Sequence, residues 1–173
     1  MAMYEEKNKP KKRSEGLDGQ RNICRRRAST ISYMIEEAKK QGISDDFARQ
    51  AIYRYGQDIG EEMLKEIKDH NDLKEFREHF AAMPHHDIYE MSLEEDNPDN
   101  FTIHFHYCPY VEEWAQQGYS GDELAHLCDI TMEGDRAIGD CFENFEFRLG
   151  KTIAQDNDVC EIFFTKKNKG ESK

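Results

Sequence analysis

The chain has 173 residues, a formal net charge of −12 and 35% charged residues. This length is typical of a single domain whose core folds without disulfides or a structural metal. An acidic chain repels the phosphate backbone, which argues against broad nucleic-acid binding. Because no stretch is long and apolar enough for a membrane span or a signal peptide, we expect a soluble, cytoplasmic protein.

Basic residues are concentrated at the start of the chain. Residues 1–27 contain nine Lys or Arg and four Asp or Glu, although the whole chain is acidic. Residues 1–20 have no apolar periodicity, so we expect a disordered, solvated tail whose removal leaves stability unchanged. Residues 21–173 are expected to form a single α+β domain.

Apolar residues at helical spacing predict three helices in the first half of the chain. The first covers residues 23–40 and ends at Gly42, and the second follows Ser44 as its N-cap. The third follows Asn71 and ends before Pro84. We expect this part of the molecule to be entirely helical.

Two glycines interrupt the apolar stripe of the second predicted helix. Gly56 and Gly60 lie four residues apart, and each costs about 1 kcal/mol relative to alanine inside a helix. Their position therefore predicts either close packing against another helix or a break.

The sequence period changes to two in the second half of the chain. Alternating segments around the turn at residues 96–100 predict a hairpin, and helices are expected after Cys108 and Ser120. The expected strands cover residues 89–94, 101–108, 145–149 and 159–164. The fold class is therefore α+β, with N-terminal helices followed by an antiparallel sheet of about four strands covered by helices.

Residue types with catalytic chemistry are concentrated between residues 101 and 135. A strand over residues 101–107 places His104, His106 and Cys108 on the face opposite its apolar side chains. Pro109 suits the first position of a helix, so Cys108 lies at a helix N-terminus, where the dipole favours a thiolate. We expect these three side chains to share one cavity; the alternative for Cys108 is a buried, unreactive thiol.

Several short elements occur in a recognisable order. They are residues 51–56, His106–Pro109, Trp114, Leu127–Ile130, Glu133–Asp135 and Asp158–Glu161. Together they resemble the L-2-amino-thiazoline-4-carboxylic acid hydrolase family of bacteria, over roughly residues 23–164. The C-terminal half also looks like the 4-vinyl reductase type of small-molecule-binding domain. The first resemblance implies hydrolytic opening of a thiazoline ring to N-carbamoyl-L-cysteine, a step of cysteine metabolism.

Ring opening needs a nucleophile, a proton for the departing sulfur and counter-charges for the amidine and carboxylate of the substrate. We expect Cys108 as nucleophile with His106 or His104 as base, and Asp135, with Asp129, as further catalytic residues. Cys128 and Asp135 are seven residues apart on one predicted helix and so face the same way. The alternative for Asp129 is a solvated helix face. The expected substrate-binding residues are His104, Arg54, Cys128 and Cys160, with Arg54 as the ligand of the substrate carboxylate.

A zinc site is the competing chemistry. Cys108, Cys128 and Cys160 with His106 or His104 offer thiolate and imidazole ligands, and a zinc-bound hydroxide would then attack the ring. The spacings match no standard zinc pattern, so the cofactor is either none or zinc. Five cysteines without a close CxxC pair are typical of free thiols.

Two functions therefore follow from the sequence. The first is a hydrolase that opens a thiazoline or related cyclic amidine ring. The second is a non-catalytic sensor domain that binds a small molecule or a metal. The sequence contains no helix-turn-helix pattern that would favour sensing, so we favour the enzyme. The expected partner is a small-molecule substrate, with neither nucleic acid nor membrane, and homodimer formation stays open.

Overall fold

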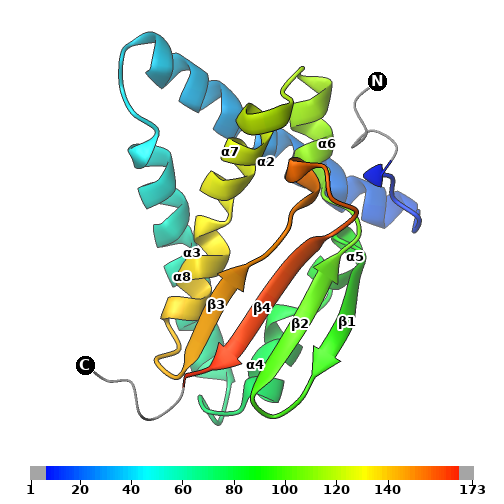
Figure 1. Ribbon diagram of the computed structural model, residues 1–173, viewed down its shortest axis with the longest axis vertical. Helices are drawn as coiled ribbons and strands as arrows, with labels where there is room; N and C mark the ends of the chain where they lie inside the picture. Colours follow the sequence, from blue (N-terminus) through cyan, green and yellow to red (C-terminus); the bar gives the residue numbers. More distant parts are fainter. Residues whose placement is uncertain (1–6, 168–173) are drawn as a thin grey trace.

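The computed structural model describes residues 7–167 of the chain (Figure 1). In chain order the elements are α2 (Glu15–Lys40), α3 (Asp46–Glu66), α4 (Leu73–Phe80), α5 (His85–Ile88), β1 (Met91–Asp96), β2 (Asn100–Phe105), α6 (Pro109–Gln116), α7 (Gly121–Thr131), α8 (Glu133–Asp140), β3 (Phe145–Leu149), the 3₁₀ turn η1 (Ile153–Gln155) and β4 (Cys160–Lys166). Helices and one antiparallel sheet of four strands confirm the predicted α+β class. Within residues 7–167, no helix is both long and apolar enough to cross a membrane.

The four strands lie in the order β1-β2-β4-β3, and every neighbouring pair is antiparallel. β1 and β2 form the predicted hairpin, with a register shift between Leu93 and Glu95. The C-terminal strand β4 pairs along β2, so that Cys160 lies opposite Phe105. This pairing brings the end of β2 and the start of β4 together at one end of the sheet.

The main core lies between the sheet and the helices. Phe76 of α4 is fully buried, and its ring lies 4.8 Å from the ring of Phe164 and 6.2 Å from that of Phe101, by centroid distance. Figure 1 shows α4 behind the sheet, with α3 and α8 beside β3. α2 packs against α6, and α3 against α8. The expected apolar face of β2 is buried, since Phe101, Ile103 and Phe105 contribute to this core.

The two glycines of α3 mark its contact with α8. A Cβ on Gly56 would lie 2.8 Å from the Cβ of Ala137, and one on Gly60 would lie 2.9 Å from the Cβ of Cys141. Both glycines are buried, and α3 runs without interruption across them. The prediction of close packing against another helix is therefore confirmed, and the alternative of a break in the helix is wrong.

The first helix begins earlier than its apolar pattern predicts. α2 starts at Glu15, with Ser14 as N-cap accepting a hydrogen bond from the Leu17 N–H at 3.2 Å. Residues 7–14 contact the rest of the molecule, and Asn8 and Arg21 are buried. The disordered tail expected for residues 1–20 is thus wrong for residues 7–20, because main-chain groups and carboxylates of the body supply partners for this basic segment. Residues 1–6 lie outside the described residues.

Two predicted N-caps are displaced by one residue. Asp45 rather than Ser44 is the N-cap of α3, and Asp72 rather than Asn71 is that of α4. The Asp72 carboxylate accepts from the Lys74 N–H at 2.9 Å. Asp, Asn and Ser are all good N-caps, so neighbouring candidates are not distinguished by residue type alone.

Candidate functional site

Cys108 lies where β2 leads into α6. It is the N-cap residue of α6, and Pro109 is the first helical residue, as expected. The Tyr110 and Val111 N–H groups at the start of α6 favour the Cys108 thiolate and act to lower its pKa. Burial outweighs their effect and raises the pKa of Cys108 to about 11. The resting thiolate expected from the helix N-terminus is therefore wrong, because desolvation penalises the charged form more than the helix start favours it.

Two further cysteines interact electrostatically with Cys108. Cys128 comes from α7 and Cys160 from the first position of β4, and both are buried. The Ile153 N–H donates to the Cys160 sulfur at 3.3 Å, and the Thr152 side chain acts to lower the pKa of Cys128. Burial raises the pKa of both thiols above the ordinary range. All three thiols are thus neutral at physiological pH.

Asp135 adds a carboxyl group to these thiols. The chain turns from α7 to α8 at Met132, so Cys128 and Asp135 are not on one continuous helix as expected. Electrostatic interactions still connect Asp135 with Cys108 and Cys160. Burial raises the pKa of Asp135 to about 7, although Arg136 opposes the shift. We call Cys108, Cys128, Cys160 and Asp135 the thiol cluster.

Two tyrosines border the thiol cluster. The pKa values of Tyr89 and Tyr110 are raised, chiefly by burial, and both interact electrostatically with Cys108. The Tyr89 ring stacks on Phe105, and the Tyr110 ring meets Trp114 edge-on. These phenols are neutral, so they add polar groups to the cluster without adding charge.

Arg27, and not Arg54, interacts with the thiol cluster, in addition to Arg136. Arg27 of α2 is exposed, lies 4.1 Å above the centroid of the Tyr55 ring and interacts electrostatically with Asp135. Arg54, which the sequence predicted as a carboxylate ligand, is exposed on α3, and no contact in the described part of the chain connects it with the thiol cluster. Arg27 lies in a run of three arginines, and nothing in the local sequence distinguishes it from the other two.

The structure separates both histidines from Cys108. The Nε2 atom of His106 lies 2.7 Å from the Ser92 hydroxyl, and Nδ1 of His104 lies 3.7 Å from the Glu94 carboxylate. β2 ends at Phe105, after which the N–H groups of His106 and Tyr107 both donate to the carbonyl of Tyr89. The strand alternation stops before Cys108, so the shared cavity predicted for the three side chains is wrong.

Asp129 belongs to an ion-pair network that also contains Glu133, Arg49 and Arg136. Arg49 of α3 contacts the carboxylates of Asp129 and Glu133 at 2.8 and 2.9 Å. Arg136 contacts the same two carboxylates at 2.6 and 3.0 Å. Partial burial would raise the pKa of Asp129, but hydrogen bonds from Arg136 and Arg49 outweigh it and lower that pKa. Asp129 therefore joins helices instead of facing the thiols with which the sequence grouped it.

The proposed zinc ligands do not form a metal site. Within residues 7–167, no group of three or more His, Cys, Asp or Glu side chains is arranged to hold a metal ion. Cys108, Cys128 and Cys160 interact with one another, but His106 contacts Ser92 instead. All five cysteines are free thiols. The donor set expected for zinc is thus incomplete.

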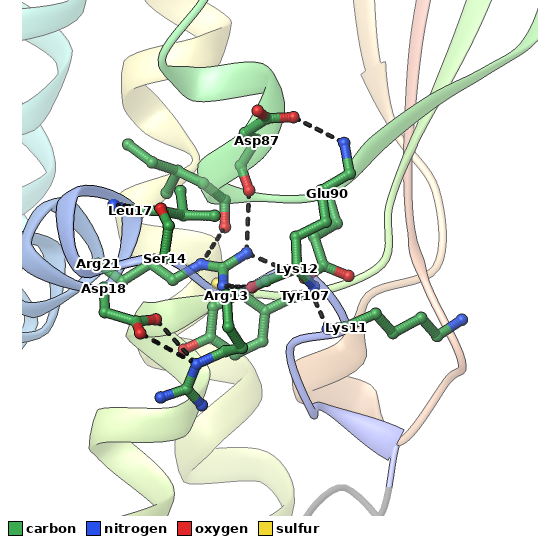
Figure 2. Close-up of polar contacts among 12 residues, drawn as sticks. Lys11, Lys12, Arg13, Ser14, Leu17, Asp18, Arg21, Asp87, Glu90 and Tyr107 are labelled. Carbon is green, nitrogen blue, oxygen red and sulfur yellow. Dashed lines mark hydrogen bonds and ion pairs between the residues drawn. The ribbon is translucent and has the colours of Figure 1, made fainter.

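A buried ion pair next to Cys108 was not anticipated from the sequence (Figure 2). Arg21 Nη2 lies 3.0 Å from the Glu90 carboxylate, and the side chains are 4% and 6% exposed. The Arg21 guanidinium also lies 4.6 Å from the centroid of the Tyr107 ring, one residue before Cys108. A signal was present, since Arg21 lies seven residues before Ala28 and shares its buried helix face.

The fold is also found in a solved structure of another protein. It is a trafficking protein particle complex subunit 3 from Naegleria fowleri, covalently bound to palmitic acid, with a TM-score of 0.54 and 14% sequence identity. The match covers 84% of this chain and 96% of that one. At this identity the likeness shows the fold alone. A search of curated proteins gave no match.

A family model matches most of the chain. The model of the L-2-amino-thiazoline-4-carboxylic acid hydrolase family matches residues 21–164, from the first half of α2 into β4. The matched region includes every member of the thiol cluster together with Arg27. This match confirms the family resemblance found in the sequence.

Proposed function

Because the chain belongs to the L-2-amino-thiazoline-4-carboxylic acid hydrolase family, we propose that it hydrolyses this thiazoline acid, or a related cyclic amidine, to the N-carbamoyl thiol. The observation that carries the proposal is the electrostatic interaction of Cys108 with Asp135. One is a thiol at a helix start, and the other is an acid whose pKa is raised to about 7. For the thiazoline acid the product is N-carbamoyl-L-cysteine, which places the reaction in cysteine metabolism.

Asp135 is the general base that activates Cys108. A carboxyl group whose pKa lies near neutral pH is present in both protonation states, which suits a group that accepts a proton and later returns it. Cys108 itself is protonated at rest, since its pKa is about 11. A substrate amidinium beside the sulfur stabilises the thiolate and so lowers the pKa of the Cys108 thiol. The nucleophile therefore forms only once substrate is bound.

The ring opens in two displacements. The Cys108 sulfur attacks the ring carbon that lies between the sulfur and both nitrogens, while Asp135 takes the thiol proton. The bond from that carbon to the ring sulfur then breaks, and the departing sulfur takes the proton from Asp135. An isothiourea remains on Cys108. Water adds to the same carbon, Asp135 accepts one water proton, and cleavage of the bond to Cys108 leaves the carbamoyl group and restores the thiol. The net reaction consumes one substrate and one water.

Arg27 binds the substrate carboxylate in this proposal. Its guanidinium is stacked on Tyr55 and remains charged at all physiological pH values. A planar guanidinium pairs well with a carboxylate through two parallel hydrogen bonds. Arg27 thus replaces Arg54, which the sequence predicted for this role. Cys128 and Cys160 are neutral thiols that exclude water beneath the reacting carbon.

Turnover of L-2-amino-thiazoline-4-carboxylate tests this proposal. The purified full-length chain is incubated with the acid across mildly acidic to mildly basic pH, and N-carbamoyl-cysteine is followed by mass spectrometry. We expect product to form at many equivalents per protein chain and Arg27→Ala to raise KM more than it lowers kcat. An absence of product throughout this range, from protein that is folded, would overturn the hydrolase proposal.

A second candidate is a non-catalytic domain that binds a small acid. It is favoured by the raised pKa values of all three clustered thiols, which leave no resting thiolate. The solved structure with the same fold is described as covalently bound to palmitic acid, which illustrates ligand binding on this fold. Calorimetry separates the candidates, because binding of the thiazoline acid without any product identifies the binding domain.

A further inference from the structure

Asn8 pairs with the main chain of Cys108 on both sides. Its Oδ1 accepts from the Cys108 N–H at 2.8 Å, and its Nδ2 donates to the Cys108 carbonyl at 2.9 Å. Asn8 is 6% exposed, which is low for a residue of a polar, basic segment. A side-chain amide has a donor and an acceptor on one carbon, so it imitates a peptide group and fixes the orientation of the residue that it pairs with.

Lys7, the residue before Asn8, joins the same segment to the loop before β4. Its Nζ lies 3.1 Å from the Asp158 carboxylate and donates to the Asp156 carbonyl at 3.0 Å. This loop leads directly into β4, whose first residue is Cys160, a member of the thiol cluster. The pair Lys7 and Asn8 therefore contacts the chain on either side of the site, next to Cys108 and close to Cys160.

The following residues are fixed to Glu90. The N–H groups of Lys11 and Lys12 donate to the Glu90 carboxylate at 2.7 and 2.8 Å, and Arg21 pairs with the same oxygen (Figure 2). Arg21 also donates to the Lys12 carbonyl at 2.6 Å. Glu90 has a φ of 50°, a conformation that costs energy for a residue other than glycine and is maintained by its partners. This network anchors Lys11 and Lys12, which lie three and four positions beyond Asn8.

We propose that Asn8 is a positioning residue for Cys108, and that Lys7, Lys11 and Lys12 hold Asn8 in place through their contacts with the rest of the molecule. This inference rests on the proposed role of Cys108 as nucleophile. Cys108 has φ −133° and ψ 111°, the extended conformation of the N-cap residue of α6, where the N–H groups of Tyr110 and Val111 favour the thiolate. Asn8 holds the peptide groups on both sides of Cys108 and so keeps the sulfur at the start of this helix. Freed from Asn8, the thiolate loses part of this stabilisation.

The test measures both turnover and the reactivity of Cys108. In the full-length chain, Asn8→Ala is expected to lower kcat by about 10- to 100-fold, a typical cost of misplacing a reacting group, while KM changes little. Alkylation of Cys108 by iodoacetamide, followed by mass spectrometry of its peptide in the absence of substrate, is expected to slow at each pH. A sulfur that is no longer held at the start of α6 loses the favourable effect of the helix N–H groups, which raises the thiol pKa and accounts for this decrease.

Lys9→Ala is the matched control, because Lys9 is exposed in the same segment. We expect it to leave kcat and alkylation unchanged. Asn8→Asp is the second variant: it retains the acceptor for the Cys108 N–H but places an anion near the thiol, so alkylation should slow further while the fold is kept. A folded Asn8→Ala protein with unchanged kcat and unchanged alkylation would overturn the inference. Since alkylation needs no substrate, slowed alkylation in a protein without thiazoline turnover supports positioning and rejects only the proposed reaction.

Discussion

Asp129 and Asp135 lie six residues apart on consecutive helices, yet their surroundings give them opposite properties. Asp129 is paired with Arg49 and Arg136 in the ion-pair network, and its pKa is lowered. Asp135 interacts electrostatically with the thiols of the cluster, and burial raises its pKa to about 7. The difference follows from geometry, because two guanidinium groups contact one carboxylate and none contacts the other as an ion pair.

This contrast separates stabilising charge from reactive charge. A carboxylate satisfied by arginines holds helices together and has little tendency to exchange protons near neutral pH. A carboxyl group buried among neutral thiols costs stability when ionised but is ready for proton transfer, which is a property of functional sites. We therefore assign a stabilising role to the ion-pair network and a catalytic role to the thiol cluster.

The largest expected effect comes from removing the nucleophile of the thiol cluster. Cys108→Ser should lower kcat by about 10³-fold or more while the fold is kept, because serine is similar in volume but needs far stronger activation. Cys141→Ser is the control, since Cys141 contacts α3 near Gly60 and lies outside the cluster. Steady-state turnover of the thiazoline acid measures both. Retained turnover in Cys108→Ser would leave direct attack by water as the alternative.

The contact between α3 and α8 supports both regions, so disturbing it should cost stability. Gly56→Ala places a methyl group against the main chain of Gly134 and is expected to destabilise the protein by about 2–3 kcal/mol, as overpacked sites do. Gly19→Ala in α2 meets no atom within 4 Å and should gain about 0.5–1 kcal/mol from helix propensity. Urea unfolding compares the two. Equal stabilities would show that α8 can move away from α3 without cost.

Asp135→Asn should make stability less dependent on pH. The pKa of Asp135 is raised in the folded state to about 7, so its ionisation opposes folding. This cost is absent below the ordinary pKa of about 4, grows as pH rises towards 7 and stays constant above it. Relative to the wild type, the variant should therefore be more stable at mildly basic pH and equally stable at acidic pH. Melting curves across this range measure the difference, and a variant that is less stable at basic pH would contradict a buried neutral acid.

The smallest effect is expected in the ion-pair network. Arg49→Met should destabilise the protein by about 0.5–1 kcal/mol, because these partly exposed pairs are screened by solvent. The loss should shrink as salt concentration rises, and kcat should not change. Urea unfolding at low and high salt measures it. A large decrease in kcat would mean that the network orients Asp135, and the division between the two regions would then fail.

Local patterns predicted much of the fold. Alternation and turn residues were sufficient for the hairpin β1-β2, and the paired glycines of α3 indicated its close contact with α8. The start of α2 was missed because Arg21 and Asn8 look like solvent-exposed residues until their partners are known. Glu90 and the main chain of Cys108, which supply those partners, are more than 60 residues away in sequence. Composition cannot reveal such long-range pairing.

The site was predicted only in part for the same reason. Periodicity placed Cys108 at a helix start, but it extended the β2 alternation beyond Phe105 and so grouped His104 and His106 with the thiol. Helical spacing placed Asp135 near Cys128, whereas nothing local indicated that Asp129 would meet Arg49 from α3. The pKa of Cys108 depends on burial by several elements, which a local pattern does not contain.

The most direct test of the central claim compares turnover of L-2-amino-thiazoline-4-carboxylate by Asp135→Asn and Asp129→Asn at neutral pH. Each variant replaces one carboxyl group by an amide of the same shape, and the two positions differ only in their surroundings. If the thiol cluster is the reacting site, Asp135→Asn should lower kcat by about 100-fold or more, as expected for loss of a general base, while Asp129→Asn stays within about threefold of the wild type. Equal losses in both variants, or a loss confined to Asp129→Asn, would contradict the assignment.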